Sequence, residues 1–411
     1  MKNIRLLILA TIIITAACNT SKNDSTTDLA GIWHAELDMA PDVLPFGLEL
    51  IQSGEKWRAV LINAEERLEI EGIRVSSDSV WIPLGIFDSD IKAVITKTGE
   101  LKGSYIRNYA SDYIMPFSAS KSSERKRFNT SEPPSTDFSG RWKTVFQDNS
   151  GKTYEAIAVL DQAGDRITGT FLTALGDYRF LEGNVSGDTF YLSAFDGSHA
   201  FFFQGDVLDD GSLQGRFRSG PRYKETFIAV RDEEFELPDA GSLTYLNEGF
   251  ETLDFTFPDT DGKMVSIQDE QFKDKVVLVQ LFGTWCPNCM DETKYLAPWY
   301  EQNKARGIEI IGLAFESKPE FDYASKRVKN AAERLGANYN FLIAGVSNKE
   351  KASQALPALN SVVAFPTLIY IDKKGKVRHI HTGFNGPGTG GLYDRWIEEH
   401  ESLVNRLLGE G

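Results

Sequence analysis

An internal repeat governs the first half of this 411-residue chain. The stretch "LAGIWHAEL" at Leu29 is echoed by "FSGRWKTVF" at Phe138, and "KTGELKGSYI" is echoed by "DDGSLQGRFR". Short alternating runs rich in β-branched and aromatic residues, separated by Gly, Asp and Asn turns, are typical of antiparallel strands joined by hairpins. The repeat therefore predicts two copies of an all-β module of roughly 90 residues, closed as barrels or packed as sandwiches, over residues 28–121 and 137–231.

Each copy opens on a Gly-x-Trp, with the tryptophans at Trp33 and Trp142. This pattern resembles the first strand of lipocalin-like barrels, which would make the modules pockets for an apolar ligand. Agreement at two residues favours the simpler interpretation that each Trp fills one end of a barrel core. The polar, proline-bearing stretches 122–136 and 232–248 are predicted linkers.

The pattern changes after residue 248. Continuous apolar runs of strand length, such as "VVLVQLFG", "IEIIGLAFES" and "PTLIYID", alternate with amphipathic stretches such as "FDYASKRVKNAAERLG". Strands of this kind alternating with helices predict an α/β domain over residues 249–411 whose sheet is covered by helices on both faces. The turn "KKGK" separates the last two strands, so the sheet should be mixed.

The N-terminus has the features of an export signal. Two cations are followed by an apolar run that is too short to span a bilayer as a mature helix, and then by small residues before Cys18. The small residues ahead of Cys18 resemble a bacterial lipobox, although Thr15 stands where the motif prefers Leu. We expect residues 1–17 to be a signal peptide, Cys18 to carry lipid, and residues 18–27 to be a tether on the periplasmic side of a bacterial membrane.

The number and spacing of the cysteines limit the roles that these residues can have. The chain has three cysteines, so Cys286 and Cys289 remain if Cys18 carries lipid. A bridge across two residues closes a very short loop, which stabilises a fold least in the chain-entropy view. A closed zinc site needs four ligands, and this pair supplies only two. The net charge of −15 repels nucleic acid.

The stretch "GTWCPNC" follows the strand "VVLVQLF" directly and precedes a predicted helix. Cys286 should therefore lie at a helix N-terminus, where free N–H groups and the helix dipole lower the pKa of a thiol. Pro287 suits the first helical turn, and Cys289 lies one turn further in. This asymmetry suits thiol exchange, in which Cys286 attacks a partner disulfide and Cys289 resolves the mixed disulfide.

Residues 249–408 resemble the TlpA/ResA type of thioredoxin-like thiol:disulfide oxidoreductases. The resemblance rests on "FPDTDGKMVSI", "KVVLVQLFGTWCPNC" and "FPTLIYIDKKGKV". It implies a thioredoxin-like fold and a redox-active disulfide between Cys286 and Cys289. It further implies that Pro366 is cis and packs beside the pair, so that Phe365 can pair its backbone with a bound substrate strand.

The resemblance also assigns further site residues. Family members carry a carboxylate three residues after the second cysteine, and Glu292 stands at that position as a proton donor and acceptor. Thioredoxin itself places a buried Asp in the preceding strand, where this chain has Gln280. The substrate-facing wall is predicted to comprise Trp285, Pro287, Phe365 and Pro366.

The "Pro-Asn" between the cysteines offers no cation to stabilise a thiolate. We therefore expect a potential of roughly −200 to −270 mV rather than the −120 mV of DsbA, and a protein-disulfide reductase rather than an oxidase or isomerase. Its partners would be protein disulfides and a membrane electron donor, with no separate cofactor.

Three alternatives stay open. The pair could bind metal with His379 and His381, which share one face of a strand. The chain could be a peroxidase, although "QLFGTWC" lacks the Pro-x-x-x-Thr-x-x-Cys pattern of peroxiredoxins. Finally, the β modules could be a ligand- or partner-binding unit with an accessory redox domain.

Overall fold

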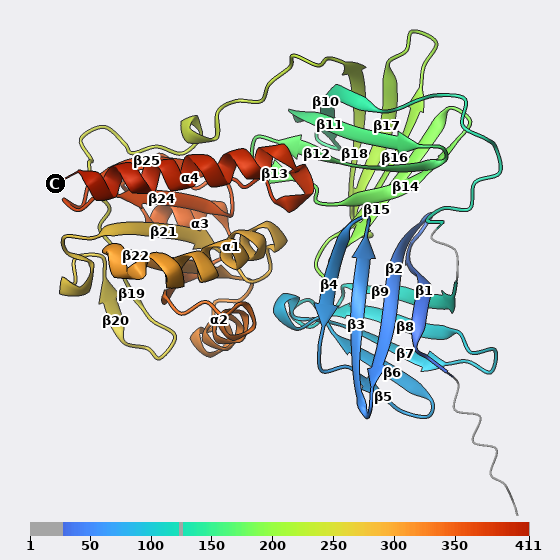
Figure 1. Cartoon of the computed structure of the whole chain (residues 1–411), viewed down its shortest axis with the longest axis horizontal. Coiled ribbons are helices and arrows are strands. Elements are labelled where there is room, and N and C mark those ends of the chain that lie inside the picture. Colours follow the sequence, from blue (N-terminus) through green and yellow to red (C-terminus); the bar gives the residue numbers. More distant parts are fainter. Residues whose placement is uncertain (1–27, 123–125, 411) are drawn as a thin grey trace, which may run out of the picture.

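The computed structural model describes residues 28–122 and 126–410. Two β units are followed by an α/β unit, which packs against both of them (Figure 1). Cys18, the predicted signal peptide and the predicted tether lie outside the described residues. Within residues 28–122 and 126–410, no helix is both long and apolar enough to cross a membrane.

The first β unit is a nine-stranded antiparallel sheet that forms a half-barrel. Its strand order is β4-β3-β2-β1-β9-β8-β7-β6-β5. The strands are β1 (Gly31–Met39), β2 (Asp42–Ser53), β3 (Lys56–Asn63), β4 (Glu66–Ile70), β5 (Arg74–Val75), β6 (Ser79–Pro83), β7 (Ser89–Ile95), β8 (Leu101–Arg107) and β9 (Ile114–Lys121), with a 3₁₀ turn η1 (Gly85–Phe87) before β7.

The second β unit repeats this meander and closes it into a barrel, because β11 pairs with β12 as well as with β10. Its strands are β10 (Gly140–Asp148), β11 (Thr153–Ala163), β12 (Arg166–Thr173), β13 (Gly176–Asp177), β14 (Leu181–Ser186), β15 (Thr189–Phe195), β16 (Ala200–Val207), β17 (Leu213–Ser219) and β18 (Tyr223–Arg231). Aromatic side chains such as Phe146, Phe171 and Phe203 fill the interior.

The duplicated tryptophans occupy equivalent places. Trp33 and Trp142 are each 1% exposed, and each indole Nε1 donates to the carbonyl four residues earlier, that of Leu29 at 3.0 Å and that of Phe138 at 2.9 Å. A cation from the last strand of each unit lies over the ring, Lys121 over Trp33 and Arg231 over Trp142. The prediction of a duplicated β module is confirmed, and the tryptophans are core residues.

The two β units share a core. Phe195, Ala200 and Phe202, from the β15–β16 hairpin of the second unit, pack into the apolar core of the first. Arg127, which lies between the two units in the chain, is also held in place, because it is 5% exposed and forms an ion pair with Glu182. The hairpin thus covers the concave side that the half-barrel leaves open.

The C-terminal unit has a five-stranded sheet in the order β23-β22-β21-β24-β25, and the sheet is mixed, as predicted. The strands are β21 (Val276–Phe282), β22 (Ile308–Glu316), β23 (Asn340–Val346), β24 (Thr367–Ile371) and β25 (Val377–Thr382), preceded by the hairpin β19 (Thr256–Pro258) and β20 (Met264–Ser266). Helices α1 (Pro287–Asn303), α2 (Phe321–Leu335) and α4 (Gly391–Gly409) pack on one face, and α3 (Lys349–Ala355) packs on the other with the hairpin. The thioredoxin-like arrangement expected from the sequence is confirmed.

Candidate functional site

The cysteine pair lies where the central strand β21 passes into α1. Cys286 is the N-cap of α1, Pro287 is its first residue, and Cys286 and Cys289 form a disulfide with a Cα–Cα distance of 5.3 Å. The backbone N–H of Cys289 donates to the Cys286 sulfur at 3.2 Å. An N–H donor at a helix N-terminus favours negative charge on that sulfur once the pair is reduced.

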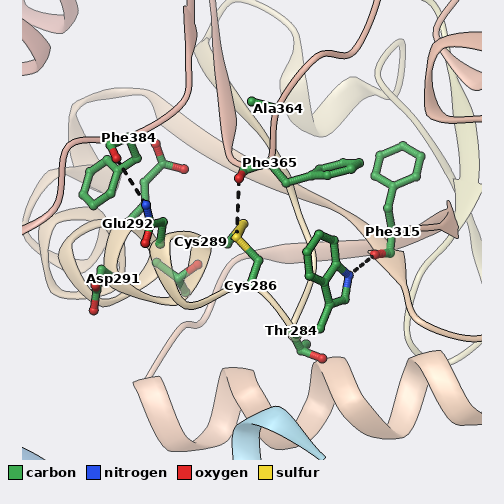
Figure 2. Close-up of a disulfide and its surroundings, with 12 residues drawn as sticks. Thr284, Cys286, Cys289, Asp291, Glu292, Phe315, Ala364, Phe365 and Phe384 are labelled. Atoms are coloured by element: carbon green, nitrogen blue, oxygen red, sulfur yellow. Dashed lines mark hydrogen bonds between the residues drawn. A yellow bond between two sulfur atoms is a disulfide. The ribbon is translucent and has the colours of Figure 1, made fainter. Parts of the chain in front are cut away.

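The loop that precedes β24 forms the opposite wall. The Phe365–Pro366 peptide bond is cis, as predicted, and the Cys286 sulfur lies 3.4 Å from the carbonyl oxygen of Phe365 (Figure 2). The rings of Trp285 and Phe365 meet edge to face with centroids 5.8 Å apart. Of the four residues predicted for the substrate-facing wall, Trp285 and Pro287 therefore flank Cys286 in the chain, and Phe365, joined to Pro366 by the cis bond, places its carbonyl next to the Cys286 sulfur.

The loop that carries Cys286 is fixed by a buried acid that sequence reasoning missed. Glu316, 1% exposed at the end of β22, accepts from the Thr284 backbone N–H at 2.8 Å and from its hydroxyl at 2.9 Å. Burial raises the pKa of Glu316, and these two hydrogen bonds oppose that rise. The Trp285 indole donates to the Phe315 carbonyl at 2.8 Å. The sequence did contain a signal for Glu316, because a charged residue ends the largely apolar run "IEIIGLAFE".

Glu292 lies on α1 behind the disulfide (Figure 2). Its side chain is 0% exposed, and its Oε2 accepts from Gln280 Nε2 at 2.8 Å. Its Oε1 has no hydrogen-bond partner within the described residues. Burial raises the pKa of Glu292 to about 8, and the hydrogen bond from Gln280 offsets only part of that effect. A carboxyl that titrates near pH 8 can both give and take a proton under physiological conditions.

Gln280 belongs to the same buried network. Its amide also donates to Thr293 Oγ1 at 3.1 Å, and its carbonyl oxygen lies 3.4 Å from the Tyr339 hydroxyl. Gln280 is neutral at all pH values, so it orients Glu292 without adding a second charge to the core.

The second β unit reaches the rim of the cysteine pair, which the sequence did not indicate. Ser198, in the β15–β16 turn, donates to the carbonyl of Trp285 at 2.9 Å. The amide of Asn288, between the cysteines, donates to Asp177 Oδ1 at 3.0 Å. Burial raises the pKa of Asp177 to about 7.

One buried arginine joins all three units. Arg179, 4% exposed in the second β unit, forms ion pairs with Glu66 of the first unit, Asp196 of its own unit and Asp291 of α1. Asp291 lies two residues after Cys289. Losing any one of these three partners would leave the buried charge of Arg179 less well compensated.

A cleft of about 840 Å³ lies where the three units meet. Pro287 and Met290 of α1, Ile86 and Phe87 of the first unit, and Arg179 contribute to its lining. Pro287, one of the four residues predicted for the substrate-facing wall, therefore lines this cleft as well as flanking Cys286.

The residues named for a metal site are not brought together. Within residues 28–122 and 126–410, no group of three or more His, Cys, Asp or Glu side chains is arranged to hold a metal ion. His379 and His381 lie on β25 and, with His400, line a separate pocket of about 430 Å³.

The Redoxin family model matches residues 247–393. Among curated proteins, the thiol-disulfide oxidoreductase ResA of Bacillus subtilis (strain 168) is 31% identical over 139 residues, which is 34% of this chain and 69% of that protein. ResA of Geobacillus kaustophilus (strain HTA426) is 32% identical over 130 residues, covering 32% of this chain and 66% of the relative.

Two solved structures are also similar. A thiol:disulfide interchange protein of the thioredoxin family from Chlorobium tepidum TLS is 21% identical, with a TM-score of 0.31, covering 40% of this chain and 99% of that one. A thiol:disulfide interchange protein from Bacteroides sp. is 28% identical, with a TM-score of 0.29, covering 39% and 91% of the two chains. The family match falls on the C-terminal unit, and each of the other matches covers between 32% and 40% of this chain.

Proposed function

This chain belongs to the ResA family of redoxin-type thiol-disulfide oxidoreductases, and from that premise we propose that it reduces protein disulfides by dithiol exchange through Cys286 and Cys289. The observation that carries the proposal is the placement of the pair. A sulfur at the N-terminus of α1 faces the carbonyl of a residue before a cis-proline, and a buried carboxyl with a raised pKa lies one turn beyond the second cysteine.

The first step is the attack of the Cys286 thiolate on one sulfur of the substrate disulfide. A bond forms between Cys286 and that sulfur, the substrate S–S bond breaks, and the other substrate sulfur leaves as a thiolate that takes up a proton. Phe365 is proposed to support this step by pairing its backbone, next to the cis Pro366, with an extended substrate segment.

The second step is the attack of Cys289 on the Cys286 sulfur. The Cys289 proton passes to the Glu292 carboxylate, the mixed disulfide breaks, and the first substrate sulfur is released as a thiolate that is protonated to a thiol. Two electrons have then moved to the substrate, and the Cys286–Cys289 disulfide has formed. An electron donor, proposed to lie in the membrane, must reduce it again.

The proposed direction rests on "Pro-Asn" between the cysteines. The Asn288 amide donates a hydrogen bond to Asp177 and, being neutral, does not stabilise a thiolate as a cation would. A reduction potential of roughly −200 to −270 mV therefore remains the expectation. The proposed location, a bacterial lipoprotein on the periplasmic side of a membrane, rests on the N-terminal sequence with Cys18.

Trapping tests the proposal directly. Cys289→Ser should accumulate a mixed disulfide between Cys286 and its substrate in cells, and mass spectrometry would identify the partner. Cys286→Ser is the matched control and should trap nothing at this site. Failure to trap any protein, with Cys286 still reactive toward small thiols, would contradict a protein-disulfide reductase.

A further inference from the structure

The second β unit occupies part of the surface through which a substrate must approach Cys286. With all units present, Cys286 is 6% exposed and Cys289 is 0% exposed. The covering elements are the β12–β13 hairpin and the β15–β16 turn, and both belong to a unit that the family match leaves outside.

Contacts from these elements fall on three sides of the pair. Ser198 binds the carbonyl of Trp285, the residue before Cys286, and Asp177 binds the amide of Asn288. On the third side, the hairpin packs against Gly383 so closely that a Cβ on this glycine would lie 2.6 Å from the Leu175 carbonyl carbon. Gly383 in turn donates its N–H to the carbonyl of Pro366, at 2.9 Å.

The covering elements contact the α/β unit through a small number of polar contacts, whereas the β15–β16 hairpin shares the apolar core of the first β unit. Arg179 forms its ion pair with Asp291 two residues after Cys289, and its backbone lies against the loop at Gly388. The apolar core of the second unit and that of the α/β unit are separate clusters. The hydrogen bonds of Ser198 and Asp177 each contribute little net free energy, whereas the buried Arg179–Asp291 ion pair costs more to break. These contacts can therefore open without unfolding either unit, and Arg179 opposes the opening most.

We propose that the β12–β13 hairpin and the β15–β16 turn determine substrate size, so that Cys286 reacts readily with small or locally extended disulfides and slowly with bulky protein disulfides. Arg179, through Asp291, is the residue that positions this cover. The inference rests on the proposed function and narrows its substrate class. Larger substrates react only in the fraction of molecules in which the ties are broken.

The test compares two oxidants of the pre-reduced, full-length protein: the small aromatic disulfide 5,5′-dithiobis(2-nitrobenzoate) and insulin. The variant is Asp291→Asn with Ser198→Ala, which loosens two ties and leaves Arg179 paired with Glu66 and Asp196. The control, Glu301→Gln, makes the same chemical change as Asp291→Asn on the same helix but disrupts only the surface ion pair with Lys304. Single-turnover oxidation is followed by alkylation and mass spectrometry.

We expect the double variant to raise the insulin rate roughly tenfold, since weakening two polar ties costs the closed state about 1–2 kcal/mol, and to leave the small-disulfide rate unchanged. Each single variant should give a smaller rise, so the test does not depend on the double variant folding well. A measurable insulin rate that is the same in the wild type and in all variants would overturn the inference and leave the proposed function standing. If neither wild type nor variants reduce insulin while both react with the small disulfide, the proposed function itself is contradicted.

Discussion

Gln280 Nε2 donates a 2.8 Å hydrogen bond to Glu292 Oε2 in the core behind the cysteine pair. The bond leaves Glu292 Oε1 without a hydrogen-bond partner among the described residues. A neutral amide therefore takes the place of the second carboxylate that thioredoxin itself would bring to this strand. The arrangement gives the site one titrating group rather than a coupled pair, which simplifies its pH dependence.

Replacing Glu292 by Gln should slow resolution of the mixed disulfide, because Cys289 loses the carboxylate that accepts its proton. We expect a decrease of roughly 10²-fold in the rate at neutral pH. The pH–rate profile of the wild type should show an inflection near pH 8 that the variant lacks. Glu301→Gln, on the same helix, should leave both the rate and the profile unchanged. An inflection that persists in Glu292→Gln would assign the proton transfer to another group.

Replacing Gln280 by Leu should move that inflection upward. The hydrogen bond from Gln280 lowers the pKa of Glu292, so its loss leaves the effect of burial unopposed. Because Glu292, Thr293 and Tyr339 all lose a partner, the variant should also be less stable by about 1–3 kcal/mol. Titration of the rate and denaturant unfolding measure the two effects, and Gln280→Glu, which adds a second buried acid, should split the titration into two steps. A downward shift in Gln280→Leu would contradict this account.

The two cysteines should differ strongly in reactivity. The Cys286 sulfur, at the N-cap, accepts a hydrogen bond from the backbone N–H of Cys289, so the pKa of its thiol should lie below the usual 8.5. Cys289 is fully buried one turn further into the helix. With iodoacetamide at pH 7, Cys289→Ser, which retains Cys286, should be alkylated at least roughly tenfold faster than Cys286→Ser. Similar rates in the two variants would remove the distinction between attacking and resolving thiol.

The sequence was informative where a property is local. The strand "VVLVQLF" followed by "GTWCPNC" predicted that Cys286 lies at a helix N-terminus, and the family resemblance around Pro366 implied the cis peptide bond that the structure contains. Duplication was visible because the tryptophans and turn residues recur at matching positions. These signals depend on neighbours in the chain, which a sequence displays directly.

Contacts between distant segments could not be predicted in the same way. Arg179 lies 112 residues before Asp291 and 113 after Glu66, and nothing in the composition of the hairpin pairs it with α1. The same holds for Ser198 and the carbonyl of Trp285, because a serine in a turn has many possible partners. The closure of one β unit and the openness of the other also followed from packing, since the half-barrel is completed by Phe195 and Phe202 of its neighbour.

The raised pKa of Glu292 also makes stability depend on pH. The folded state favours the neutral carboxyl, with a pKa of about 8, whereas in the unfolded chain the pKa of Glu292 returns to its ordinary value of 4.5. Between these values the folded state binds more protons than the unfolded state, so the free energy of unfolding falls as the pH rises from about 4.5 to about 8. The disulfide-bonded wild type should lose on the order of 4 kcal/mol over this range through Glu292. Urea unfolding at a series of pH values, compared with Glu292→Gln, isolates the contribution, since the variant lacks the titrating group. If the free energy of unfolding changed with pH equally in the wild type and in Glu292→Gln, Glu292 would have to remain ionised in the folded state.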